Sequence, residues 1–126
     1  MKHQTNSELE KYLNSLFGNG VNIQDYKFPS NVPLYLDDGY HFLMTSIQGT
    51  RFIAMEPTTN EYRLPTLVKH LTKASQLTGL PCALVFSSLR SSQRSSLIQQ
   101  KIPFMVPGAQ TYLPFVHAAL TPVVGV

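Results

Sequence analysis

Apolar residues recur at helical spacing near the start of the chain. Five of them fall three or four positions apart on one helix face: Leu9, Tyr12, Leu13, Leu16 and Phe17. Ser7 and Glu10 have the spacing of a capping box, in which each side chain bonds a free backbone N–H group of the first turn. Gly18 and Gly20 favour an end there, because glycine tolerates a positive φ. The pattern therefore predicts a helix over residues 7–17.

Short apolar segments bounded by turn residues follow. Residues 21–32 mix polar residues with proline, which predicts a loop. After it, the pattern predicts three antiparallel strands, and the pair Asp38-Gly39 is typical of a tight hairpin turn. The predicted strands are residues 33–36, 40–47 and 50–55, with tight turns at 38–39 and 48–49.

Helical spacing returns in the middle of the chain. One face of residues 64–78 is apolar, with Pro65 suited to a first helical turn and Gly79 to an end. The next apolar run, Cys82–Phe86, is continuous, which is typical of a strand buried on both faces. Ser87 and Ser88 then offer N-caps for a helix over about 89–100. Two further strands are predicted, at residues 102–106 and, after a Pro107-Gly108 turn, 111–115.

The predicted order α-β-β-β-α-β-α-β-(β) indicates an α/β fold of the α+β kind, with helices packed on the faces of one mixed sheet. Strand–helix–strand units with short links favour right-handed crossovers between parallel neighbours. The chain has 126 residues, which fits one domain, predicted over 1–115. Residues 116–126 form an apolar tail, interpreted as a linker or the start of an interdomain helix leading to a C-terminal domain outside this chain.

Charge is sparse. Ten Lys and Arg residues oppose seven Asp and Glu residues, and these positions are scattered, so no basic face for nucleic acid is indicated. Charged residues make up 13% of the chain, about half the usual share, which favours an apolar surface covered by another domain or subunit. The apolar runs are short and the N-terminal segment lacks a signal-peptide core, so we expect a cytoplasmic protein without a membrane partner.

The candidate catalytic and metal-binding residues do not form a recognisable set. Cys82, the one cysteine, is predicted to be a small buried hydrophobe. The four histidines share no spacing that would chelate a metal, and we expect them to be structural or solvent-exposed: His3, His41, His70 and His117. The acids Asp37 and Asp38 are interpreted as solvated turn residues. No catalytic residue, metal or cofactor is therefore predicted.

The predicted element order is also reminiscent of a restriction-endonuclease-like core. In that resemblance, catalysis needs an acid on the second strand and an acid-x-lysine on the third. The strand over 40–47 carries no acid, and Glu56 is followed by Pro57 and Thr58, so the lysine is missing. The resemblance thus implies no active nuclease, although a catalytically degenerate relative remains an alternative.

The segment 87–96 is rich in serine and arginine. Ser87 and Ser88 come where a buried strand gives way to a helix, and helix starts attract anions. Arg90 and Arg94 are four positions apart and so share one helix face. These four residues are the candidate site for a phosphate, nucleotide or carboxylate, with simple helix capping by the serines as the alternative.

The segment from Leu80 to Phe115 resembles the N-terminal α/β domain of bacterial regulators in which that domain precedes a MarR-type winged helix. The matching features are the buried strand CALVF, the polar helix with Arg94, the strand IPFMVPG and the closing residues 112–115. The resemblance implies a non-enzymatic effector-sensing or dimerising domain, a homodimer, and DNA contacts through a domain outside this chain. The candidate site at residues 87–94 predicts, in addition, an anionic effector. The alternative is a degenerate nuclease-like or small phosphate-binding domain derived from an enzyme.

Overall fold

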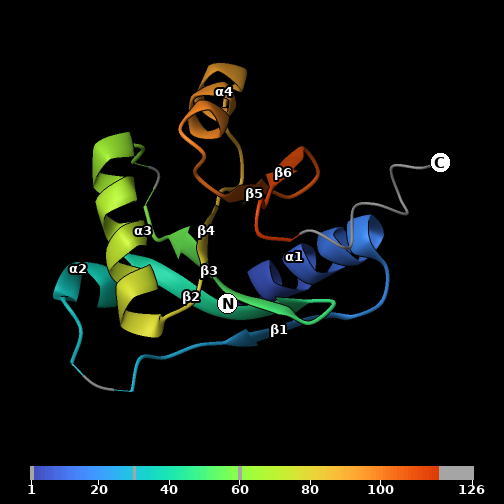
Figure 1. The fold of residues 1–126 in the computed structure, drawn as a ribbon, viewed down its shortest axis with the longest axis horizontal. Helices are drawn as coiled ribbons and strands as arrows, with labels where there is room; N and C mark the ends of the chain where they lie inside the picture. The colour runs from blue at the N-terminus through green and yellow to red at the C-terminus, as the bar shows by residue number, and fades with distance from the viewer. Residues whose placement is uncertain (1, 30, 60, 117–126) are drawn as a thin grey trace.

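Six strands form one mixed sheet in the order β1-β2-β3-β4-β5-β6 (Figure 1). The structure is a computed structural model that describes residues 2–29, 31–59 and 61–116. β3 pairs in parallel with β4, and β4 with β5, whereas the other neighbours are antiparallel. The strands are β1 Val21–Asp25, β2 Tyr40–Ile47, β3 Thr50–Pro57, β4 Cys82–Val85, β5 Phe104–Val106 and β6 Gln110–Tyr112.

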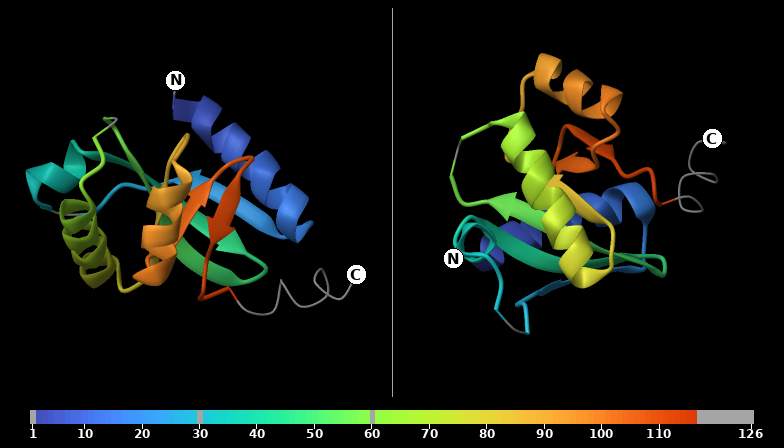
Figure 2. Two further views of the ribbon diagram at one scale, coloured as in Figure 1. Left: turned by 90° about the horizontal axis from the view of Figure 1, so that it is seen from above. Right: turned by 60° about the vertical axis from the view of Figure 1, so that its left-hand side comes forward.

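The helices lie on both faces of this sheet (Figure 2). They are α1 Lys2–Phe17, α2 Leu34–Asp37, α3 Leu64–Thr78 and α4 Ser91–Gln99. The core under α1 contains Leu9 and Leu13, and we call it the α1-side core. The core on the other face contains buried residues of the remaining three helices, and we call it the α3-side core. The predicted α/β fold with helices on the faces of one mixed sheet is therefore confirmed.

Both cores meet at β4, whose residues are all buried. Ala83 and Val85 belong to the α1-side core, whereas Cys82 and Leu84 belong to the α3-side core. Alternate side chains of a strand point to opposite faces, so a strand covered on both faces needs an unbroken apolar run. The prediction of a doubly buried strand is confirmed, with its end at Val85 rather than Phe86.

The two crossover helices pack against the same face of the sheet. α3 joins β3 to β4 and contributes Leu67 and Ala74 to the α3-side core, while α4 joins β4 to β5 and contributes Leu97. The predicted parallel pairing of these strands is confirmed. The likeness to a restriction-endonuclease core is not shown by this architecture and stays an expectation.

The predicted start of the first helix is wrong. α1 begins at Lys2, so Ser7 lies inside the helix and is not its cap. A capping box marks a helix start only where the preceding chain leaves the helix, and residues 2–6 instead continue it. The predicted end is confirmed, because Gly18 has a φ of +75° and its N–H bonds the Asn14 carbonyl at 2.8 Å.

Part of the predicted loop over 21–32 is strand β1, which pairs antiparallel with β2 from Val21 opposite Ile47 to Asp25 opposite Leu43. Val21 and Ile23 pack against the α1-side core, whereas the residues between and after them are exposed. Such alternation is the pattern of an edge strand with one covered face. It extends over too few residues to separate the strand from a polar loop by sequence alone.

The strand predicted at 33–36 is instead the short helix α2. The Pro33 carbonyl accepts hydrogen bonds from the N–H groups of Leu36 at 3.0 Å and Asp37 at 3.2 Å. Leu36 is buried in the α3-side core, while Leu34 is 70% exposed. Four residues are too few to distinguish helical from extended periodicity, which explains the error.

The bounds of the later elements agree with the predictions to different degrees. α3 has the predicted bounds and ends at Gly79, whose φ is +72°. α4 begins at Ser91 with Arg90 as its N-cap residue, so the prediction that Ser87 and Ser88 cap it is wrong. The two closing strands are confirmed but shorter than predicted. Residues 117–126, most of the predicted tail, lie outside the described residues.

Gly39 joins α2 to β2 at a point where the backbone is crowded. A Cβ atom at this position would run into the carbonyl oxygen of Tyr35. We expect Gly39→Ala to lower the free energy of unfolding by about 1–3 kcal/mol, as overpacking does in well-packed interiors. Urea unfolding measures the change.

Gly79→Asn is the matched control for Gly39→Ala. Gly79 has open space around its Cβ position and a left-handed conformation that asparagine tolerates at helix ends. The control is expected to lose less stability than Gly39→Ala. Equal losses in the two variants would contradict the steric argument.

Candidate functional site

A cleft of about 170 Å³ opens between α2, the start of β2, the end of β3 and the first turns of α3. We call it the aromatic cleft. Tyr35 and Tyr40 line it together with one histidine of α3, His70. Glu61 and Arg63, from the β3–α3 connection, also line it. The cleft thus combines ring faces with one group of each charge.

A hydrogen bond joins the Tyr40 hydroxyl to His70 Nδ1 at 2.8 Å. Burial raises the pKa of Tyr40 to about 12, so its hydroxyl is protonated at neutral pH. Burial, and secondarily the charge of Lys69, lower the pKa of His70, which favours the neutral ring. We therefore assign Tyr40 as the donor and Nδ1 as the acceptor, which leaves the ring proton of His70 on Nε2.

Two aromatic rings hold the His70 ring in place. Tyr35 stacks on it with the ring centroids 4.5 Å apart and an angle of 23° between the planes. Tyr40 meets it edge-on, at 5.5 Å and 88°. Tyr35 is 45% exposed, so its ring is the accessible edge of the cluster. The cleft is therefore built on a fixed ring cluster with an accessible edge.

The sequence did not reveal this cluster. His70 was expected to be structural or solvent-exposed, and its place on the polar face of α3 gave no reason to pair it with a tyrosine. Tyr40 and His70 are 30 positions apart, and their meeting depends on how α3 packs over β2. Only the order of the elements could have suggested that the start of β2 and α3 lie close together.

Ser87 and Ser88 line a second cleft, of about 270 Å³, where β3 and β4 end. We call it the edge cleft. Its charged lining residues are the carboxylates Glu56 and Glu61, and neither predicted arginine lines it. The structure thus brings the two serines together in a cleft whose charge is negative.

The two arginines of the predicted anion site lie at the start of α4. Arg94 donates from Nη1 to the Leu89 carbonyl at 2.9 Å. The backbone N–H of Arg90 donates to Gln93 Oε1, also at 2.9 Å. Arg94 therefore fixes the chain just before the helix. Nothing in these contacts tests anion binding by the four residues, which stays a prediction.

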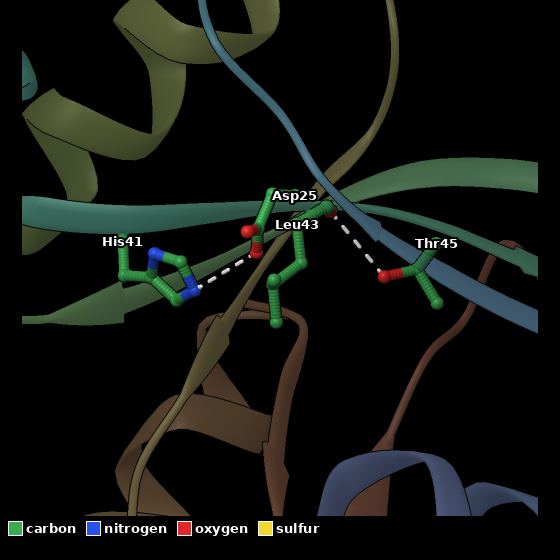
Figure 3. A network of polar contacts seen from close by, with 4 residues as sticks. All are labelled: Asp25, His41, Leu43 and Thr45. Atoms are coloured by element: carbon green, nitrogen blue, oxygen red, sulfur yellow. Dashed lines mark hydrogen bonds and ion pairs between the residues drawn. The ribbon is translucent and has the colours of Figure 1, made fainter. Parts of the chain in front are cut away.

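A polar contact joins β1 to β2 (Figure 3). His41 Nε2 lies 3.4 Å from Asp25 Oδ1, near enough for an ion pair when the ring is protonated, although Nε2 makes no hydrogen bond. In the same view the Thr45 hydroxyl donates to the Leu43 carbonyl at 3.3 Å. The His41–Asp25 contact links the edge strand to its neighbour, whereas the Thr45 hydrogen bond lies within β2, and we assign both a structural role.

The single cysteine is buried, as predicted. Cys82 is 4% exposed, and its Sγ lies 3.7 Å from the Leu80 carbonyl oxygen. Burial raises the pKa of the Cys82 thiol to about 12, against a smaller opposing effect of the Thr78 hydrogen bond. The thiol is therefore protonated at neutral pH and is a poor nucleophile.

Residues 2–29, 31–59 and 61–116 contain neither a candidate metal cluster nor a membrane-spanning helix. Within these ranges, no three His, Cys, Asp or Glu side chains are grouped so that they could hold a metal ion. Within the same ranges, every helix is too short or too polar to cross a membrane. His117 lies outside the described residues.

Comparison with known proteins finds no match. No family model matches the chain, and no curated protein or solved structure does so either. Function is therefore inferred from the residues of this chain and from the resemblance of its sequence to regulator domains.

The lowered pKa of His70 predicts a pH dependence of stability. The folded chain binds a proton at His70 less readily than the unfolded chain, where histidine titrates near 6.5. Stability is therefore lost as the pH falls below about 6.5 towards the folded-state pKa, and is retained above it. Proton NMR of the His70 ring should show a titration midpoint below that of the urea-unfolded chain.

The variant His70→Gln provides the thermodynamic control. Since it cannot take up this proton, its free energy of unfolding should decrease less than that of the parent chain on acidification below about pH 6.5. A midpoint at or above the unfolded value, or identical pH profiles of the two chains, would contradict the prediction.

Proposed function

We propose that this chain is the effector-sensing and dimerising domain of a bacterial transcriptional regulator in the cytoplasm, with no catalytic activity of its own. The observation that carries the proposal is the aromatic cleft with its fixed Tyr35–His70–Tyr40 cluster. The resemblance of Leu80–Phe115 to domains that precede a MarR-type winged helix supports it. DNA contacts belong, in this proposal, to a domain outside these residues.

The position of the aromatic cleft supports an effector site. Its walls come from α2, β2 and α3, so a bound molecule would contact three elements at once. Tyr35 both lines the cleft and follows Leu34, which is 70% exposed. A ligand with different affinity for two arrangements of α2 would shift their populations and change the surface offered to a partner. That link between a cleft and a surface is what a sensing domain needs.

Dimerisation is supported by the sparse charge of the chain and by apolar side chains at its surface. Charged residues make up 13% of the sequence, and Leu16, Leu34 and Leu77 are exposed. The segment 112–126 is also rich in apolar residues, although its residues 117–126 lie outside the described residues. Exposed apolar patches commonly mark protein contacts.

We expect a homodimer at micromolar concentration, because burying exposed apolar surface between two copies removes it from water. Multi-angle light scattering over a series of protein concentrations measures the mass directly, and the expected mass is twice the 14.1 kDa of the chain. A mass of one chain throughout the micromolar range would contradict the proposed dimer.

The regulatory role is tested in the organism that encodes the chain. Deleting the gene is expected to change a defined set of transcripts, and restoring the parent gene should reverse the change. Chromatin immunoprecipitation of the tagged, full-length gene product should recover DNA near those transcripts. An unchanged transcriptome in cells that normally make the protein, together with no recovered DNA, would overturn the proposed function.

A further inference from the structure

We propose that the aromatic cleft binds a free aromatic α-amino acid, with its ammonium group at Glu61 and its carboxylate at Arg63. The inference deepens the proposed function by naming the class of effector, and its meaning as a regulatory signal rests on that function. Binding itself is measured on the purified chain, so the two proposals can fail separately.

The charges of the cleft are the first argument. Glu61 and Arg63 are two positions apart in the connection between β3 and α3, and both are exposed and line the cleft. Within the described part of the chain no ion pair joins them. A ligand with only a positive or only a negative group would meet one of the two as a like charge. A zwitterion with neighbouring ammonium and carboxylate groups complements both.

The start of α3 favours the carboxylate end at Arg63. Arg63 is the N-cap residue of this helix, and the first turn of α3 contains no acidic side chain. The positive end of the helix dipole is therefore not offset by a carboxylate of the helix itself. Thr66, one turn into the helix, adds a hydroxyl to the cleft lining. An anionic group is better placed here than beside Glu61.

The ring cluster selects the side chain of the ligand. Tyr35, Tyr40 and His70 present ring surfaces to the cleft, and the buried Leu67 adds an aliphatic one. Aromatic rings pack on such surfaces in offset or edge-on arrangements. His70 Nδ1 already accepts a hydrogen bond from the Tyr40 hydroxyl. It is therefore not available to bind the ammonium group of the ligand in place of Glu61. An aromatic amino acid therefore finds an apolar wall next to its charged groups.

The volume limits the size of the ligand. The cleft holds about 170 Å³, below the roughly 300–1,000 Å³ typical of sites for drug-sized molecules. An amino acid with a single ring or an indole is small enough for this cleft, whereas a dinucleotide is too large. The neutral balance of one carboxylate and one guanidinium also disfavours a phosphorylated ligand, which carries surplus negative charge.

L-Tryptophan is a suitable probe because the chain contains six tyrosines and no tryptophan, so the indole fluorescence belongs to the ligand alone. We expect a saturable change in that fluorescence on titration with the purified chain. Tryptamine lacks the carboxylate and indole-3-propionate lacks the ammonium group, and each should bind about fivefold more weakly than L-tryptophan.

The variants Glu61→Gln and Arg63→Gln show which charged group of the ligand each of the two side chains binds. Each should weaken L-tryptophan about fivefold. Glu61→Gln should not weaken indole-3-propionate, and Arg63→Gln should not weaken tryptamine. Each of these changes removes the like charge that the ligand meets, so slightly tighter binding is expected. Matched controls are Glu10→Gln and Arg51→Gln, which neutralise exposed charges outside the cleft and should not change binding. Circular dichroism checks that every variant is folded.

Three results would overturn the inference. The first is the absence of saturable L-tryptophan binding up to about 10 mM, an affinity too weak for a metabolite sensor. The second is equal L-tryptophan binding by the parent chain and both cleft variants. The third is tighter binding of tryptamine or indole-3-propionate than of L-tryptophan. If L-tryptophan binds as expected while gene deletion leaves transcription unchanged, the ligand class stands and the regulatory function fails.

Discussion

The burial of β4 on both faces constrains the rest of the structure. Its alternate side chains enter two different cores, so the strand needs cover from α1 on one side and from α3 and α4 on the other. Parallel neighbours joined through helices meet that need, since each crossover lays a helix over the sheet. The chain must therefore return from β3 to β4 through α3, and this return brings His70 towards the start of β2.

The aromatic cleft follows from that placement. His70 occupies its position because α3 packs by Leu67 and Ala74 into the α3-side core. Tyr40 starts the strand that runs antiparallel to β3, and it meets the histidine at 2.8 Å. Tyr35 then closes the cluster from α2, a turn fixed by the Pro33 carbonyl and by the crowded backbone at Gly39. A ligand in the cleft would therefore contact α2, β2 and α3 together.

The elements with long, regular patterns were predictable, and those defined by long-range contacts were not. α3 has the predicted bounds because six apolar positions repeat over four turns between a proline and a glycine. β1 and α2 were mistaken because each spans five residues or fewer, and a partner strand or a buried Leu36 decides their structure. Ser7 was mistaken for a cap because local spacing does not reveal that the helix has already begun.

The same limit explains why composition pointed to the Ser/Arg segment and did not indicate the aromatic cleft. The Ser/Arg segment stood out because its polar groups are close in sequence, yet Arg94 donates to the Leu89 carbonyl and the two serines line a cleft with carboxylates. Glu61 and Arg63 are unremarkable in sequence, and it is the fold that brings both into the lining of the cleft beside the tyrosines. Recognition chemistry depends on which charged groups folding leaves uncommitted beside an apolar wall, and that selection is made by packing rather than by local composition.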